Sequence, residues 1–219
     1  MEDPKLKVVS IFDTIQGEGP FHGTPSTFIR LQDCNLNCPS CDTFYKSGTE
    51  MSVSEILDSI SKMPDRGLVV ITGGEPFMQD FSWLVCALQD KGKSVQVETN
   101  GMLWPGEEFF SRVEVSRFVV VCSPKTPNVD ERLWRFIQAV KYIVEEGNID
   151  PEDGLPVMSL GCKVRPARPP VGWKGVIYVQ PFDSGDPLKN RRNAQAAVAT
   201  CLRHGYRLSL QVHKMLGLP

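Results

Sequence analysis

The feature that most constrains the fold of this chain is the alternation of short apolar runs with helix-like segments. Continuous apolar runs rich in β-branched residues are typical of strands that are buried on both faces. Ser52 and Glu55 form an S-x-x-E capping box ahead of apolar residues at helical spacing, which predicts a helix. We expect strands over 6–12, 26–31, 67–72, 94–100, 117–123, 140–146, 176–182 and 206–212, and helices over 52–63, 80–92, 130–138 and 190–205.

This alternation predicts an α/β fold in which a mainly parallel sheet carries helices on its outside. The Pro- and Gly-rich stretch 150–175 interrupts the pattern and is expected to be irregular. The chain has 219 residues, of which 41% are hydrophobic and 23% charged, and this composition suits one compact core. We therefore expect a single domain over residues 1–219.

Composition also narrows the classes of partner. The net charge is -2, and no Lys/Arg-rich run is interleaved with aromatic residues, so nucleic acid is not an expected partner. The first residues do not resemble a secretion signal, and no stretch approaches the roughly 20 apolar residues of a membrane span. We expect a cytoplasmic protein that binds a small molecule or another protein and does not bind a membrane.

Cys34, Cys38 and Cys41 form a C-x3-C-x2-C array near the start of the chain. Seven cysteines in a cytoplasmic chain do not favour a disulfide framework. Three thiolates alone do not complete a structural zinc site, which uses four protein ligands, although a distant histidine could supply the fourth. A [4Fe-4S] cluster on three thiolates leaves one iron open to a reacting ligand, and we favour this interpretation.

Polar or glycine-bearing motifs directly follow several predicted strands. In parallel sheets, ligands bind where the carboxyl ends of the strands meet, so these motifs should converge on one rim. The two glycines of the first motif let the backbone approach a ligand closely, although a plain tight turn would contain the same residues. The motifs are TGGEP (72–76), ETNG (98–101), SPK (123–125) and QPFD (180–183).

The cysteine array after an opening strand, with TGGEP one helix later, resembles the radical S-adenosylmethionine (SAM) superfamily. The resemblance implies a partial, TIM-like βα barrel with a reduced helix complement. It also implies that SAM binds the open iron of a [4Fe-4S] cluster and is cleaved to a 5′-deoxyadenosyl radical. Ser40 departs from the aromatic residue that often precedes the third cysteine, so adenine packing is expected to rely on Tyr45, Phe182 or backbone.

Further motifs narrow the resemblance to the 7-carboxy-7-deazaguanine synthases. The implied reaction is a Mg2+-dependent radical ring contraction of 6-carboxy-5,6,7,8-tetrahydropterin to 7-carboxy-7-deazaguanine with loss of ammonia. It is a carbon-nitrogen lyase reaction of queuosine and 7-deazapurine biosynthesis, in which SAM is used catalytically. The motifs are IFDTIQGEG, FIRLQDCNL, CDT, TGGEP, VETNG, SPK, VQPFD and LSLQVHKMLGLP, of which Q-G-E-G, C-D-T and H-K-x-L-G-x-P are the most specific.

The resemblance implies roles for residues at the matching positions and none for a catalytic side chain, since the cofactors carry the radical chemistry. It implies a core of about 24–212 and a tail, 213–219, that closes the substrate site. The cluster ligands would be Cys34, Cys38 and Cys41, and Thr43 would bind Mg2+. Substrate contacts would be Ile15, Gln16, Gly17, Glu18, Arg30, Thr72 and Pro219. SAM contacts would be Gly74, Glu75, Glu98, Ser123, Pro124, Lys125, Gln180, Pro181, Phe182 and Asp183.

Some of these residues have simpler interpretations. A guanidinium suits a carboxylate ligand, but from sequence alone a structural ion pair of Arg30 with Asp33 or Asp42 is favoured. Thr72 is also an ordinary β-branched strand end. Asp42 either lies behind the metal or caps the following turn.

The resemblance further implies a homodimer and an external reductant such as a flavodoxin. Two other functions remain open. A glycyl-radical-enzyme activase would also carry a cysteine array, but Q-G-E-G and the terminal proline do not favour it. A noncatalytic iron-sulfur or zinc module would not bind SAM, so spectra recorded with and without SAM would distinguish such a module from a radical SAM enzyme.

Overall fold

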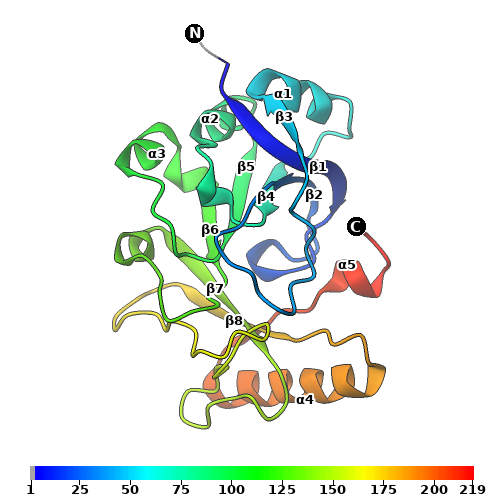
Figure 1. The fold of residues 1–219 in the computed structure, drawn as a ribbon, viewed down its shortest axis with the longest axis vertical. Coiled ribbons are helices and arrows are strands. Elements are labelled where there is room, and N and C mark those ends of the chain that lie inside the picture. Colours follow the sequence, from blue (N-terminus) through cyan, green and yellow to red (C-terminus); the bar gives the residue numbers. More distant parts are fainter. Residues whose placement is uncertain (1–2) are drawn as a thin grey trace.

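A computed structural model describes residues 3–219 and contains one nine-stranded sheet (Figure 1). The strand order across the sheet is β3-β1-β2-β4-β5-β6-β7-β8-β9. The strands are β1 (Lys5–Ile15), β2 (Pro25–Leu31), β3 (Thr49–Ser52), β4 (Leu68–Gly73), β5 (Ser94–Thr99), β6 (Phe118–Cys122), β7 (Ile137–Val144), β8 (Val176–Pro181) and β9 (Arg207–Leu208).

Parallel pairing joins β2 to β4 and then continues strand by strand to β9, whereas β1 pairs antiparallel with both β2 and β3. The register sets Arg30 opposite Thr72, and Thr99 opposite Cys122. The carboxyl ends of these strands therefore lie along one edge. The predicted mainly parallel α/β sheet is confirmed.

The helices are fewer than the strands, and several are single turns. The α-helices are α1 (Val53–Ser61), α2 (Ser82–Asp90), α3 (Glu107–Arg112), α4 (Pro187–His204) and α5 (Val212–Met215). Short 3-10 turns are η1 (Gly19–Phe21), η2 (Pro76–Met78), η3 (Val115–Arg117) and η4 (Glu131–Arg135). Within residues 3–219, none of the helices combines the length and the apolar character that crossing a bilayer would require.

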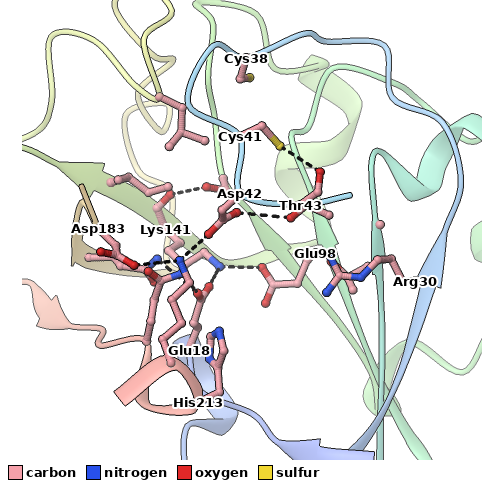
Figure 2. Close-up of a pocket in the computed structure, with 18 of the residues that line it drawn as sticks. Glu18, Arg30, Cys38, Cys41, Asp42, Thr43, Glu98, Lys141, Asp183 and His213 are labelled. Atoms are coloured by element: carbon pink, nitrogen blue, oxygen red, sulfur yellow. Dashed lines mark hydrogen bonds and ion pairs between the residues drawn. The ribbon is translucent and has the colours of Figure 1, made fainter. Parts of the chain in front are cut away.

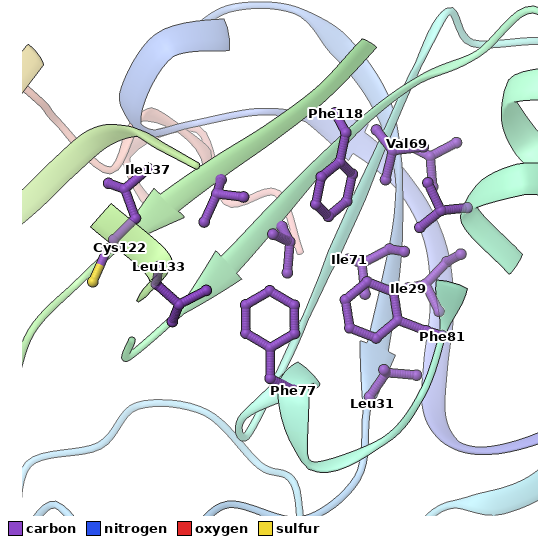
Figure 3. Close-up of a cluster of buried hydrophobic side chains, with 14 of the residues drawn as sticks. Ile29, Leu31, Val69, Ile71, Phe77, Phe81, Phe118, Cys122, Leu133 and Ile137 are labelled. Atoms are coloured by element: carbon purple, nitrogen blue, oxygen red, sulfur yellow. The ribbon is translucent and has the colours of Figure 1, made fainter. Parts of the chain in front are cut away.

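The main hydrophobic core packs strand side chains such as Ile29 and Ile71 against a group of aromatic rings (Figure 3). The rings of Phe81 and Phe109 meet edge to face with centroids 4.8 Å apart, and Phe77 stacks beside Phe81. Such edge-to-face and offset contacts add to the stabilisation from burial. The core thus holds the strand ends rigidly beneath the loops of the rim.

The helix predicted over 130–138 was wrong. This segment forms η4, whose first turn is capped by the Asp130 carboxylate accepting a bond from the Arg132 amide, and then β7 begins at Ile137. Ile137 pairs with Val120 of β6, so tertiary strand pairing overrides the local helical pattern.

Other elements also differ from the prediction. The strand expected over 206–212 is limited to Arg207–Leu208, and Val212 starts α5. Strand β3 and helix α3 were not predicted, and α3 starts after Gly106, whose φ of 101° suits glycine. Residues 150–175 contain no helix and no named strand, as predicted.

The capping box of α1 provides a test of the local analysis. The Ser52 hydroxyl accepts a bond from the Glu55 amide at 3.2 Å, and the Glu55 carboxylate accepts one from the Ser52 amide at 2.7 Å. Ser52→Ala is expected to lower the free energy of unfolding by about 1 kcal/mol in urea denaturation. Ser61→Ala, at the other end of the helix, is expected to change it by less than about 0.5 kcal/mol. Equal effects would contradict the capping role.

Candidate active site

A cavity of about 420 Å³ lies at the carboxyl edge of the sheet and is lined from most of the chain. Most of the predicted site residues line it, which agrees with the expected convergence of the strand-end motifs. Those that line it are Ile15, Gln16, Glu18, Arg30, Cys34, Cys38, Cys41, Thr43, Thr72, Gly74, Glu98, Ser123, Lys125, Gln180, Pro181, Phe182, Asp183 and Pro219. Gly17, Glu75 and Pro124 do not.

The three clustered cysteines lie on the loop between β2 and β3, and each thiol has different neighbours. The Cys34 sulfur accepts a bond from the Leu36 amide at 3.4 Å, while the Cys41 thiol faces the Thr43 carbonyl at 3.8 Å. Burial, and then the neighbouring thiol of Cys162, raise the pKa of Cys38 to about 12. All three cysteines are free thiols.

The spacing of these thiols bears on which metal group they suit. Among residues 3–219, no three His, Cys, Asp or Glu side chains are placed to hold one metal ion together. A single zinc requires its ligands in one tetrahedron, whereas each thiolate of an iron-sulfur cluster binds its own iron. The three thiols line one cavity, and their chemistry fits a cluster in which each thiolate binds a different iron.

Gly74 allows the loop after β4 to lie directly on the cysteine loop. A Cβ added to Gly74 would lie 2.0 Å from the Asp33 carbonyl oxygen and 2.8 Å from the Cys34 Cβ. The Glu75 amide donates to the same Asp33 carbonyl at 2.9 Å. No residue with a Cβ fits at this position. Packing of the two loops therefore requires glycine at Gly74, apart from any contact with a cofactor.

Glu75 turns away from the cavity and joins two strand ends. Its buried carboxylate accepts bonds from the Phe77 amide, the Thr99 hydroxyl at 2.7 Å and the Asn100 amide at 2.6 Å. Burial raises the pKa of Glu75, although these donors oppose the shift. Glu75 therefore fastens the β4 loop to the end of β5.

A buried ammonium, that of Lys141 on β7, lies between two carboxylates (Figure 2). Its Nζ is 3.0 Å from a Glu98 oxygen and also bonds Glu18, which accepts further bonds from Gln180 and Gln211. Burial opposes the charged form, yet Glu18 and Glu98 raise the pKa of Lys141. Burial raises the pKa of Glu98, whereas Lys141 and the other donors outweigh burial and lower the pKa of Glu18.

Lys141 was missed by the sequence analysis. The signal that could have identified it is a single lysine inside the apolar run AVKYIV, at a position where both faces of the sheet are buried. Lysine is almost never fully buried unless it is paired.

Arg30 projects toward the cavity without a carboxylate partner (Figure 2). Its guanidinium carbon is 5.8 Å from the ring centroid of Phe12. Within residues 3–219 its side chain forms no salt bridge, because Asp33 pairs with Lys7 and Asp42 pairs with Lys214. The structural ion pair favoured from sequence alone is therefore not formed, and burial lowers the pKa of Arg30.

Gln16 presents a second unmatched donor. Its side chain is buried and lines the cavity, and its Oε1 accepts a bond from the Glu18 amide at 3.1 Å. The Gln16 Nε2 has no hydrogen-bond partner among residues 3–219. Because a buried polar group without a partner is costly, a ligand or water that accepts a bond from this donor would be favoured.

The C-terminal segment crosses the mouth of the cavity. The Val212 amide donates to the Gly17 carbonyl at 3.4 Å, and a Cβ on Gly17 would lie 2.0 Å from the His213 Nδ1. The Thr14 hydroxyl donates to the Pro219 carbonyl oxygen at 3.2 Å. Gly17 therefore supports the tail. The resemblance placed His213 in this tail but gave it no role of its own, because its neighbour Gly17 is almost two hundred positions away in sequence.

Comparisons with known proteins were made for the whole chain. A family model described as "Radical SAM superfamily" matches residues 28–148. A 7-carboxy-7-deazaguanine synthase from Rhodospirillum rubrum is 43% identical over 97% of this chain and 92% of its own length. A second, from Rickettsia prowazekii, is 38% identical over 98% of this chain and 89% of its own length.

A solved structure gives an independent comparison of the fold. The crystal structure of QueE from Escherichia coli aligns with a TM-score of 0.70 at 23% identity, covering 94% of this chain and 93% of that one. The expected partial barrel of the radical SAM type, with few helices, is confirmed by this likeness and by the family match.

Gly74→Ala tests the close approach of the two loops. The added methyl cannot fit against the Asp33 carbonyl, so the cysteine loop must shift. After anaerobic reconstitution, the variant is expected to retain less than about half of the iron of the wild type. Gly67→Ala is the matched control, because nothing lies within 4 Å of its Cβ. Equal iron in both variants would contradict the packing argument.

Lys141→Met tests the buried ion network. It leaves Glu18 and Glu98 buried without their cation, and removing one partner of such a pair is expected to cost about 3–5 kcal/mol. Burial and mutual repulsion then raise the folded-state pKa of both carboxyls above their unfolded values. Protonation therefore stabilises the folded variant, and its deficit should be largest near about pH 7 and shrink toward about pH 4.

Thermal unfolding of wild type and variant across this pH range provides the measurement. Lys141→Met with Glu98→Gln removes one of the two uncompensated charges and is expected to recover part of the loss. A deficit that is independent of pH would show that packing, and not charge, explains the effect.

Proposed function

The chain belongs to the 7-carboxy-7-deazaguanine synthases of the radical SAM superfamily, and we propose that it contracts the ring of 6-carboxy-5,6,7,8-tetrahydropterin in the cavity described above. Membership of this lyase family implies a [4Fe-4S] cluster and SAM. The assignment of substrate atoms, Mg2+ and individual residues is our proposal.

The substrate assignment rests mainly on the guanidinium of Arg30, which forms no salt bridge within residues 3–219. A cation in a partly buried cavity, without a carboxylate of the protein beside it, favours an anionic ligand. The rings of Phe12 and Phe28 lie stacked beside it, 5.4 Å apart, and offer an apolar surface to a flat bicycle. The free amide of Gln16 suits a carbonyl or ring nitrogen. A carboxylated pterin combines these features.

The cofactors would occupy the side of the cavity nearest the cysteine loop. A [4Fe-4S] cluster with bound SAM supplies the radical chemistry, and the protein positions the reactants and excludes water. Cys34, Cys38 and Cys41 would hold the cluster, and Gly74 would bring the backbone close to the methionyl group.

The SAM side of the cavity carries a second buried cation. Lys125 donates to the Ser123 hydroxyl at 2.5 Å, and burial lowers the pKa of Lys125. An ammonium in this position suits the methionyl carboxylate. Ser123, Gln180, Pro181, Phe182 and Asp183 would complete the walls around ribose and adenine.

Thr43 is the proposed ligand for Mg2+. A hydroxyl is a weak neutral ligand, and Mg2+ usually takes few protein oxygens together with waters and substrate. The substrate carboxylate would therefore complete the site. Asp42, whose carboxylate accepts a bond from the Thr43 hydroxyl at 3.4 Å, lies behind it.

The proposal also covers how the chain encloses the substrate and how it assembles. Residues 213–219 would close the substrate side of a single domain whose core spans about 24–212, with the Pro219 carbonyl oxygen close to Thr14. A homodimer, a cytoplasmic location and reduction by a flavodoxin-like protein are expected from the family resemblance.

Turnover by the reconstituted enzyme tests the proposed function. Anaerobic protein with about four irons per chain, SAM, a reductant, Mg2+ and the carboxypterin are expected to yield 7-carboxy-7-deazaguanine, ammonia and more than one product molecule per SAM. Stoichiometric consumption of SAM without the deazapurine would overturn the proposal. Turnover without any partner protein would separate this function from that of a glycyl-radical activase.

Arg30→Lys tests, in the same assay, whether the Arg30 guanidinium binds the pterin carboxylate. Lysine keeps the charge and loses the paired donors, so kcat/KM for the pterin is expected to fall about 10- to 100-fold while the affinity for SAM is unchanged. Arg135→Lys, which alters an exposed pair with Glu107, is the control. An unchanged kcat/KM for the pterin in Arg30→Lys would remove the basis for the substrate assignment.

A further inference from the structure

The ammonium of Lys214, on α5, joins two loops at the cavity, which all three residues of the link line. Its Nζ is 2.6 Å from a carboxylate oxygen of Asp42, on the cysteine loop, and 3.3 Å from one of Asp183, after β8. The other oxygen of Asp42 faces the Thr43 hydroxyl at 3.4 Å. A continuous chain of polar contacts therefore runs from Thr43 through Asp42 and Lys214 to Asp183.

This arrangement occupies a carboxylate that adjoins Thr43, that of Asp42. A divalent cation that prefers oxygen would gain much more from a carboxylate than from a hydroxyl. Asp42 already pairs with the Lys214 ammonium, and Asp183 holds that ammonium from its other side. Without another ligand, a cation at Thr43 would meet a hydroxyl and a neutralised carboxylate.

We propose that Lys214 keeps Asp42 from serving as a metal ligand, so that a divalent cation binds strongly at Thr43 only after the substrate supplies its own carboxylate. Lys214 is then a positioning residue that makes metal binding depend on substrate. The inference rests on the proposed function for the position of the metal, and it adds the device that links metal to substrate.

Contacts other than those of Lys214 also hold the tail in place. The tail is also fastened by Val212 to Gly17, by Gln211 to Glu18 at 2.8 Å and by Thr14 to Pro219. The side chains of Lys214, Asp42 and Asp183 are 34%, 56% and 37% exposed. Ion pairs as exposed as these contribute little to stability, so removing Lys214 should leave the protein folded.

Binding of Mn2+ to the SAM-loaded, anaerobic enzyme tests the proposal without turnover. Free Mn2+ is measured by electron paramagnetic resonance, first in the absence of substrate. The wild type is expected to bind Mn2+ weakly, and Lys214→Met to bind it at least about fivefold more tightly because Asp42 is released. Adding the pterin should tighten binding to the wild type more than to Lys214→Met.

Two further variants identify the cause. Lys214→Met with Asp42→Asn should lose the gain, because no carboxylate is left to release. Lys5→Met removes an exposed Lys–Glu pair, 3.0 Å long, whose residues do not line the cavity, and should bind Mn2+ as the wild type does.

Equal or weaker binding of Mn2+ by Lys214→Met, or a gain that survives Asp42→Asn, would overturn the proposal. The substrate-free titration gives this answer whether or not the wild type turns over. Formation of 7-carboxy-7-deazaguanine by the wild type is measured separately, so failure of the proposed function is distinguished from failure of this inference.

Discussion

Parallel pairing from β2 through β4 to β8 is the interaction on which the rest of the structure depends. Since parallel strands end at the same edge, one register brings together side chains from many parts of the sequence. Arg30, Thr72, Glu98, Ser123 and Gln180 all lie at or near strand ends. The aromatic core beneath them limits how far those ends can move.

Charge is distributed unevenly along this edge. The Lys141 ammonium forms ion pairs with both Glu18 and Glu98, so its charge is balanced within the protein. Arg30 and Lys125 have no carboxylate within salt-bridge distance among residues 3–219. The described part of the cavity thus presents two partly or fully buried cations without counter-anions, which suits ligands that each carry a carboxylate.

Sequence predicts most of the sheet and the position of the site because the relevant signals are local. Apolar β-branched runs identify the central strands, and a motif after each strand identifies the rim. The helix predicted over 130–138 fails because Ile137 finds a partner on β6, which local periodicity does not record. Lys141 was missed for a similar reason, and Lys214 was expected only as part of the closing tail, since the partners of both lie far away along the chain. Motif resemblance predicted that Gly17 and Glu75 contact a ligand. In the structure both support the walls of the site: Gly17 leaves room for the tail, and the Glu75 carboxylate binds the backbone after β5.

The rim is closed by contacts between the first and last segments of the chain. The Gly19 amide bonds the Ser209 hydroxyl across 190 positions, and Gln211 reaches Glu18 across 193. During synthesis on the ribosome, the cysteine loop emerges long before the residues that cover it. A nascent or truncated chain would therefore carry its three cysteines before the C-terminal residues that help to wall the cavity are present.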